Sequence, residues 1–267
     1  MPVPPALLPR TIVVSAGARA AAAAADCATQ PCRSVPMPVP PCFADRREAG
    51  AYLARRLAEL GLAAPAGGTP PLVLALPRGG VPVAFEVARA LAAPLDVLLV
   101  RKIGAPGYPE LALGAVVEGV PPAAAPHTVA NDDPWARRAI DSGAFDAERG
   151  RQLDEIRLRQ RRYRGGAPLP PLQGRTVIVV DDGVATGATM RAALEAVRAA
   201  GAARVVAAVP VGALDGLAAL RAAADQVVCL NTPAVFGAVG AFYLDFTQTG
   251  DEEVLRLLRA AAGGAAP

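Results

Sequence analysis

The chain contains 267 residues, of which 53% are hydrophobic, 4% aromatic and 19% charged, and its net charge is +3. No apolar run reaches the roughly 18 residues needed to cross a bilayer, so we expect no membrane-spanning helix. The small net charge, without a clustered basic stripe, argues against nucleic-acid binding. The length suits one large domain or two small ones with a sizeable core.

Residues 1–42 differ in composition from the rest of the chain. They are rich in proline and alanine, contain one acidic residue and show no amphipathic period. This predicts a poorly ordered tail before a domain over 43–267. The pentapeptide MPVPP occurs at residue 1 and again at Met37, so one hypothesis is that Met37 starts the native protein. The alternatives are a chance repeat and a targeting peptide, although the charged n-region of a signal peptide is missing.

The four cysteines form neither a disulfide framework nor a zinc-binding pattern. Three of them, Cys27, Cys32 and Cys42, fall in the tail, whereas Cys229 ends an apolar run far from the others. This cysteine usage favours a cytoplasmic protein.

From residue 43 onward, segments with helical spacing alternate with short apolar runs. Asp45 is a suitable N-cap, and leucines at helical spacing predict a helix that stops at Gly61. The unbroken apolar run over 71–76 predicts a strand buried on both faces. Further helices are predicted over 81–93, 145–164, 190–201 and 213–224, and further strands over 95–102, 111–119, 175–180, 203–210 and 225–230.

This alternation predicts an α/β fold. Strands that are repeatedly followed by helices form a parallel sheet with right-handed crossovers and helices on both faces. Such sheets bind ligands at the carboxyl ends of their strands, so functional residues are expected directly after the predicted strands.

The stretch VIVVDDGVATGATM, residues 177–190, places two adjacent carboxylates after an apolar strand. Asp181 and Asp182 repel each other and cannot be buried cheaply, so we expect them to be exposed and to serve a ligand. The small residues that follow let backbone amides approach an anion, and the start of the next helix adds a favourable dipole. Neither the P-loop pattern nor the dinucleotide fingerprint is present. Carboxylate acceptors beside a phosphate cradle suit a phosphorylated sugar.

This stretch resembles the phosphoribosyl-pyrophosphate (PRPP) binding motif of the type I phosphoribosyltransferases, in which four hydrophobic residues precede two acidic residues and a Thr-Gly loop. The resemblance implies that family's parallel sheet with helices on both faces and a small hood. It also implies that Asp181 and Asp182 bind the ribose hydroxyls. The 5′-phosphate would be wrapped by Ala185, Thr186, Gly187, Ala188 and Thr189. The alternative is a solvated turn at an acidic helix N-terminus.

The segment LPRGG, at the end of the first predicted strand, resembles the pyrophosphate loop of the same family. Arg78 offers a fixed-charge donor fork, and Gly79 and Gly80 let the backbone meet phosphate oxygens. Alone, the segment also fits an ordinary turn between a strand and a helix. The resemblance further implies a non-proline cis peptide between Pro77 and Arg78.

The segment RKIGAPGYPELALG, residues 101–114, resembles the flexible catalytic loop of the family, most closely that of adenine phosphoribosyltransferases. Its Lys102 is the single lysine of the chain, and a compact ammonium suits a departing pyrophosphate. Glu110 falls near a glutamate of that loop. The resemblance therefore names Lys102, Arg78 and Glu110 as catalytic residues, with an exposed turn and a solvated Glu110 as the alternatives.

The order of these motifs resembles a group of uncharacterised phosphoribosyltransferase-like proteins over roughly residues 43–260. After the last predicted strand, residues 233–246 lie where related enzymes close a loop over the base. This segment carries four aromatic residues that would either stack on a planar acceptor or pack in the core: Phe236, Phe242, Tyr243 and Phe246.

The implied function is transfer of the phosphoribosyl group from PRPP to a nitrogenous base or amine, as a step of nucleotide metabolism. Mg²⁺ is the expected cofactor, held through the substrate and also by Asp181 and Asp182. The other candidate is a regulatory protein that binds PRPP or a nucleotide without turnover. Ala185 stands where enzymes for 6-oxopurines carry an aspartate, so adenine or another aminated heterocycle is the first acceptor we predict. A homodimer is a further hypothesis.

Overall fold

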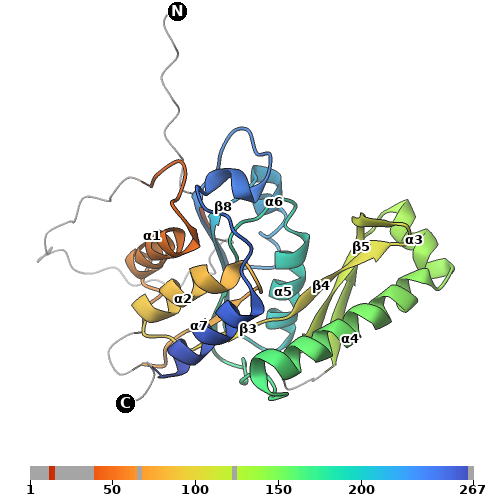
Figure 1. The fold of residues 1–267 in the computed structure, drawn as a ribbon, viewed down its shortest axis with the longest axis horizontal. Coiled ribbons are helices and arrows are strands. Elements are labelled where there is room, and N and C mark those ends of the chain that lie inside the picture. The colour runs from red at the N-terminus through yellow and green to blue at the C-terminus, as the bar shows by residue number, and fades with distance from the viewer. Residues whose placement is uncertain (1–11, 16–38, 65–67, 122–124, 264–267) are drawn as a thin grey trace, which may run out of the picture.

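The computed structural model describes residues 12–15, 39–64, 68–121 and 125–263, and its centre is a sheet in the order β1-β9-β8-β7-β2-β3 (Figure 1). Five neighbouring strands of this sheet run parallel. The predicted α/β fold is therefore confirmed. The five strands are β2 (Leu72–Ala75), β3 (Leu95–Val97), β7 (Thr176–Val180), β8 (Arg204–Val211) and β9 (Gln226–Asn231).

The sixth strand, β1 (Ile12–Ser15), lies at the edge of the sheet and pairs antiparallel with β9. No strand was expected there, because the surrounding segment has the composition of a tail. The remaining predictions for residues 1–38, including those on Met37, Cys27 and Cys32, lie outside the described residues.

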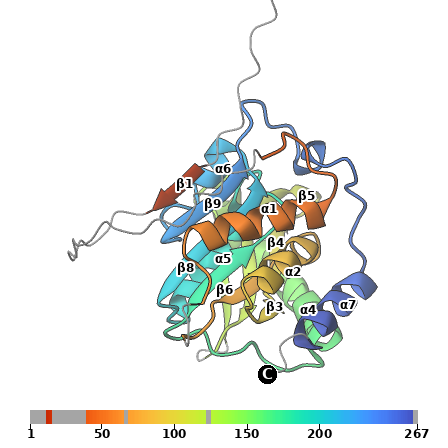
Figure 2. The same cartoon turned by 90° about the vertical axis from the view of Figure 1, so that its left-hand side faces the viewer.

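Helices cover both faces of the central sheet (Figures 1 and 2). Ile178 and Val180 of β7 belong to the core beneath α1 and α2, whereas Val177 and Val179 belong to the core beneath α5. Both faces of β7 are thus buried, which explains its unbroken apolar sequence. On the first face lie α1 (Arg46–Glu59), α2 (Gly80–Ala90) and α7 (Asp251–Gly263); on the second lie α5 (Ala188–Ala199) and α6 (Leu214–Ala218).

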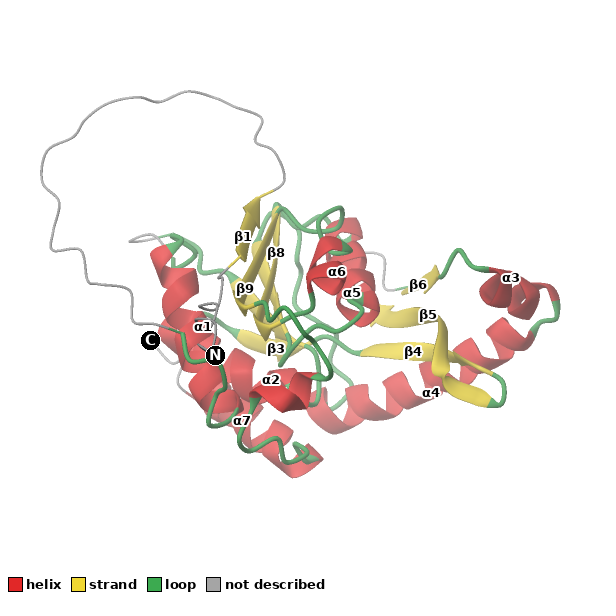
Figure 3. Cartoon of the chain, turned by 90° about the horizontal axis from the view of Figure 1, so that it is seen from above, coloured by secondary structure: helices red, strands yellow, loops and turns green. Residues whose placement is uncertain are grey.

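Between β3 and β7 the chain leaves the central sheet and builds a projecting lobe (Figures 1 and 3). Three strands form its antiparallel sheet, in the order β4-β5-β6, and α4 packs along β4 and β5 while α3 lies towards the outer end. The elements of the lobe are β4 (Val100–Ala105), β5 (Tyr108–Gly119), β6 (Pro126–Ala130), α3 (Pro134–Asp141) and α4 (Ala144–Arg164).

The prediction of a single strand over 95–102 was wrong. The chain changes sheets at Leu98 and Leu99, which are both buried, so one apolar run supplies the end of β3 and the start of β4. The strand predicted over 111–119 exists, but it is part of β5 in the lobe. The helix predicted over 213–224 is shorter, because α6 ends at Ala218 and turns follow it.

A buried ion pair fixes the base of the lobe. The backbone N–H of Leu99 donates to Glu118 Oε1 at 2.8 Å, and the N–H of Glu118 donates to the Leu99 carbonyl at 2.9 Å. Arg164, at the end of α4, pairs with Glu118 and donates to the Val97 carbonyl of β3 at 2.9 Å. Glu118 is 1% exposed, so this pair joins β3, β5 and α4 away from water. Burial raises the pKa of Glu118, and the charge of Arg164 opposes that shift.

The N-cap predicted at Asp45 is confirmed, because its carboxylate accepts hydrogen bonds from the backbone of Arg47 and Glu48. Within the described parts of the chain, no helix has both the length and the apolar character that a membrane span requires.

Candidate active site

The acidic pair lies where the sequence predicted, directly after β7 at the carboxyl edge of the parallel strands. The loop over 183–187 then leads into α5, whose N-cap Gly187 has φ +79°. A Cβ there would lie 2.5 Å from the Gly216 carbonyl oxygen, so only glycine fits. Ala185 and Thr186 are exposed, and no described side chain caps the start of α5. The first amides of α5 are therefore available to an anion.

The PRGG turn, residues 77–80, contacts the acidic pair directly. A Cβ on Gly79 would lie 2.1 Å from Asp182 Oδ2, and one on Gly80 would lie 2.7 Å from the Val180 carbonyl oxygen. The two turns meet because β2 and β7 are paired neighbours, with Ala75 opposite Val180. The peptide bond between Pro77 and Arg78 is cis, as the resemblance implied.

The acidic pair is less exposed than we predicted. Both residues are half-buried, and the side chain of Asp182 is only 15% exposed. Burial and the neighbouring charge of Asp182 raise the pKa of Asp181 well above its ordinary value. Burial also raises the pKa of Asp182, but there a positive partner opposes the shift. The pair can be buried because this partner, Arg46, compensates one of the two charges.

Arg46 is a site residue that the sequence analysis missed. Its Nε donates to Asp182 Oδ2 at 2.8 Å, and its Nη1 donates to the Thr247 carbonyl at 2.9 Å. The guanidinium carbon lies 3.8 Å from the centre of the Phe246 ring. These partners are 136 and about 200 residues away along the chain, so no local pattern marks Arg46. The local sequence places Arg46 only in the first turn of α1, directly after the N-cap Asp45.

The predicted hood segment contributes both packing and a polar contact to the site. Tyr243 is 5% exposed, and its hydroxyl donates to the Asp182 carbonyl oxygen at 2.6 Å. Its ring packs against Phe43 and Phe246. Phe236 and Phe242 stack on each other with ring centres 5.5 Å apart. Core packing is therefore the observed role of Tyr243, whereas the stacked pair is only half-buried.

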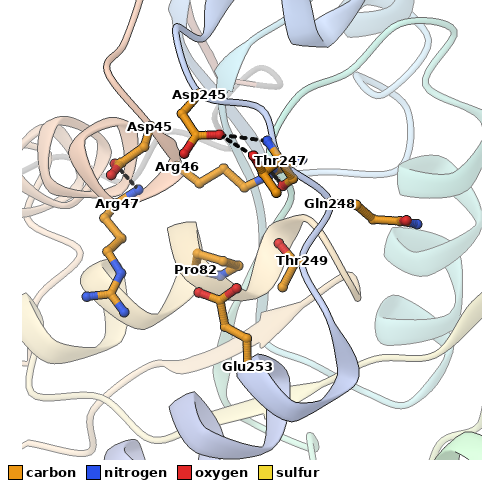
Figure 4. Close-up of a pocket in the computed structure, with 9 residues that line it drawn as sticks. All are labelled: Asp45, Arg46, Arg47, Pro82, Asp245, Thr247, Gln248, Thr249 and Glu253. Carbon is orange, nitrogen blue, oxygen red and sulfur yellow. Dashed lines mark hydrogen bonds between the residues drawn. The ribbon is translucent and has the colours of Figure 1, made fainter.

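A pocket of about 280 Å³ opens between the start of α1, α2 and the segment that leads into α7 (Figure 4). Arg46 lines this pocket and also pairs with Asp182, which is not among the lining residues. Asp245 accepts hydrogen bonds from the backbone and hydroxyl of Thr247, which orders this segment. The lining residues are Asp45, Arg46, Arg47, Pro82, Asp245, Thr247, Gln248, Thr249 and Glu253.

Arg78 points toward the first turn of α7. Its Nη1 lies 3.9 Å from Asp251 Oδ1, and its side chain is 30% exposed. Asp251 also accepts a hydrogen bond from Tyr163 and pairs with Arg162 at 2.6 Å, both on α4. Arg78 therefore has a long ionic contact within a cluster that joins the PRGG turn to the lobe.

Lys102 lies on β4 and is exposed at the mouth of a second pocket, of about 570 Å³. Thr189, from the first turn of α5, lines the same pocket, so the structure brings Lys102 and the predicted phosphate cradle together. Arg101 and Arg151 also line it and make it basic. Two predicted site groups that are 87 positions apart in the sequence thus share one cavity.

The predicted flexible loop over 101–114 is a β-hairpin. β4 and β5 pair antiparallel around a turn at Gly107, whose φ is +75°. Glu110 lies on β5, and its side chain is outside the described part of the structure, so its catalytic role stays a prediction.

The fold and the two adjoining turns define a phosphoribosyltransferase-type domain. Residues 46–247 match the sequence profile of the family described as "Phosphoribosyl transferase domain", and the chain therefore belongs to this family.

Relatives of known sequence and structure agree with this assignment. A protein of Mycobacterium tuberculosis (strain ATCC 25618 / H37Rv), named "Putative phosphoribosyl transferase Rv0571c", is 52% identical over 217 residues, and its counterpart in strain CDC 1551 / Oshkosh matches equally. The match covers 81% of this chain and 46% of those proteins, so the chain spans less than half of their length. The crystal structure of TT1426 from Thermus thermophilus is 51% identical, with a TM-score of 0.66 over 81% of this chain and 97% of that one.

Proposed function

We propose that this protein transfers the phosphoribosyl group of PRPP to a nitrogenous base or amine and releases pyrophosphate. The contact between the two turns carries the proposal, because a Cβ on Gly79 would lie only 2.1 Å from the carboxylate of Asp182. A ligand that fills both turns needs sugar hydroxyls for the carboxylates and a phosphorylated group on the same sugar for the PRGG backbone. PRPP has both features.

Each turn has a distinct role in this proposal. Asp181 and Asp182 accept hydrogen bonds from the ribose hydroxyls. The 5′-phosphate is bound by the loop and the α5 N-terminus, through Ala185, Thr186, Gly187, Ala188 and Thr189. The pyrophosphate is bound by Arg78, Gly79, Gly80 and Lys102. The C1–O bond to pyrophosphate breaks as the acceptor nitrogen bonds to C1, and that nitrogen gives up a proton to pyrophosphate or water. The protein must therefore hold the sugar in line and neutralise the departing charge.

Mg²⁺ is the cofactor that we propose for this reaction. The described residues contain no group of three or more metal-ligating side chains, so this part of the chain alone offers no complete metal cage. Two adjoining carboxylates beside a site for phosphates nevertheless suit a hard cation that binds mainly through its substrate. When bound, Mg²⁺ neutralises pyrophosphate charge. Asp181 and Asp182 are the residues that would contact it.

The acceptor that we propose first is adenine or another aminated heterocycle. Ala185 is exposed beside the cradle and cannot take a proton, so a base that this loop must deprotonate is a poor substrate.

We also propose a cytoplasmic location and a homodimer. Sedimentation of the purified protein tests whether it is a homodimer.

Pyrophosphate release from PRPP and Mg²⁺ tests the proposed function, with adenine, hypoxanthine, guanine and simple amines offered in turn. We expect release that depends on the acceptor and is fastest with adenine or a related heterocycle. Faster release with hypoxanthine or guanine would reject the acceptor class but not the transfer. PRPP binding without release on any acceptor would favour the regulatory protein instead.

A further inference from the structure

Arg46 connects three separate parts of the candidate site. It belongs to the first turn of α1, it pairs with Asp182 after β7, and it donates to the Thr247 carbonyl beyond the hood segment. Its guanidinium also lies 3.8 Å from the centre of the Phe246 ring. The side chain is only 10% exposed, so this set of contacts is largely closed to water.

The contacts of Asp182 with the surrounding protein converge on one of its carboxylate oxygens. Arg46 and the Gly79 backbone both approach the same oxygen, Asp182 Oδ2. The Tyr243 hydroxyl holds the backbone carbonyl of Asp182 at 2.6 Å, and the Asp182 N–H donates to Asp181 Oδ1 at 2.9 Å. The carboxylate of Asp182 is thus fixed through Oδ2, and its Oδ1 takes no part in that contact.

We infer that Arg46 is a positioning residue that orients the Asp182 carboxylate for the ribose hydroxyls of PRPP. This inference rests on the proposed function only in the choice of ligand, because it concerns binding and not turnover. A carboxylate beside Asp181 would otherwise turn away from its like-charged neighbour. The Phe246 ring and the hydrogen bond to the Thr247 carbonyl hold the plane of the guanidinium. The N–H groups at Nε and Nη1 therefore keep their directions.

Lysine cannot replace arginine here without loss. An ammonium would keep the positive charge but would lack the planar fork that reaches Asp182 and the Thr247 carbonyl together. Charge compensation and orientation can therefore be separated by comparing Arg46→Lys with Arg46→Met.

The test measures binding of two probes by titration calorimetry: PRPP with Mg²⁺, and inorganic pyrophosphate without Mg²⁺, because Asp182 is itself a proposed contact of that cation. Only PRPP presents ribose hydroxyls. We expect Arg46→Met to lower PRPP affinity by about 10- to 100-fold, the usual effect of losing an outer-shell partner, while pyrophosphate affinity is unchanged. Arg46→Lys should fall between wild type and Arg46→Met. Arg55→Met is the matched control, because Arg55 is exposed on the same helix and lies over Tyr52.

Four outcomes would overturn the inference. PRPP affinity could be unchanged in both variants, or both probes could weaken together, which would indicate a general loss of site structure. If Arg46→Met does not fold, Arg46→Lys is the deciding variant. A PRPP affinity of Arg46→Lys equal to that of wild type would then reject the positioning role of Arg46. Wild-type protein that binds PRPP without turnover would reject the proposed transfer and leave this inference standing. Failure of wild type to bind PRPP would overturn both.

Discussion

The central sheet and the projecting lobe supply different parts of the proposed site, and they are built differently. The ribose and phosphate turns follow β2 and β7, which are paired neighbours buried on both faces. Lys102 instead lies on an antiparallel hairpin outside that sheet. Sheet register therefore fixes the two turns relative to one another, whereas the position of Lys102, a residue that we propose binds the leaving group, depends on how the lobe is attached. Substitutions in the two regions should then separate binding from turnover.

The largest effect is expected from substitutions of the acidic pair, which follows β7 of the central sheet. Asp181→Asn with Asp182→Asn removes the charged acceptors for two ribose hydroxyls. Because hydrogen bonds to charged groups contribute roughly 1.5–3 kcal/mol each, we expect a loss of about 3–6 kcal/mol in PRPP binding. Calorimetric titration with PRPP and Mg²⁺ measures it, and a thermal unfolding curve checks the fold. Retained PRPP affinity with a large loss of stability would mean that the pair is structural.

The attachment of the lobe should be the next most sensitive feature. Arg164→Met leaves Glu118 buried without its positive partner, which typically costs about 3–5 kcal/mol of unfolding free energy. Urea unfolding measures the change. Arg157→Met is the matched control on the same helix, because the ion pair between Arg157 and Asp154 is exposed and should contribute at most about 1 kcal/mol.

The same variant has an expected pH dependence. Burial raises the pKa of Glu118 and Arg164 opposes the shift, so the pKa should rise further without Arg164. A group whose pKa is raised by folding stabilises the fold below its ordinary pKa of 4.5, and the benefit is lost as pH rises through the folded pKa. The destabilisation by Arg164→Met should thus be smallest near pH 4.5 and grow toward neutral pH. If the loss of unfolding free energy did not depend on pH, its cause would be lost packing and not the charge of Glu118.

Turnover should be most sensitive to the lobe's lysine. Lys102→Met removes a donor for the departing pyrophosphate, and the loss of one such donor typically lowers kcat by about 10²- to 10³-fold. PRPP affinity should fall less than the rate, because the PRGG turn, the acidic pair and the 5′-phosphate loop still bind the substrate. Lys102→Arg should restore part of the rate. If Lys102→Met instead lowers PRPP affinity and leaves kcat unchanged, the lobe belongs to the binding half of the site.

The smallest effect that we expect is a change in unfolding free energy caused by the half-buried Asp181. The pKa of Asp181 is raised by burial and by Asp182, so ionising Asp181 in the folded protein opposes folding above its ordinary pKa of 3.8. Asp181→Asn should therefore increase the unfolding free energy near neutral pH and have little effect near pH 3.8. Urea unfolding at both pH values measures the difference. Equal increases in unfolding free energy at the two pH values would mean that the charge of Asp181 is not the cause.

Local patterns in the sequence were sufficient for strands β2 and β7 of the central sheet and for the positions of the turns that follow them. The apolar runs of β2 and β7 predict strands buried on both faces, and the residues after such strands meet at one edge whatever the details of packing. The positions of Asp181, Asp182 and the PRGG turn follow from that rule. The half-burial of the acidic pair did not follow, because the compensating charge comes from a distant helix.

The sequence by itself determined most of the alternation of strands and helices and the positions of the two turns that we propose bind PRPP, because hydrophobic period, glycine and acidic residues act over a few neighbouring positions. Only the tertiary structure decided that the run over 95–102 divides between two sheets and that Glu118 meets Arg164 at the lobe base. It also decided that Arg46 reaches Asp182. Contacts between residues far apart in sequence depend on how whole elements pack, and no local period records them.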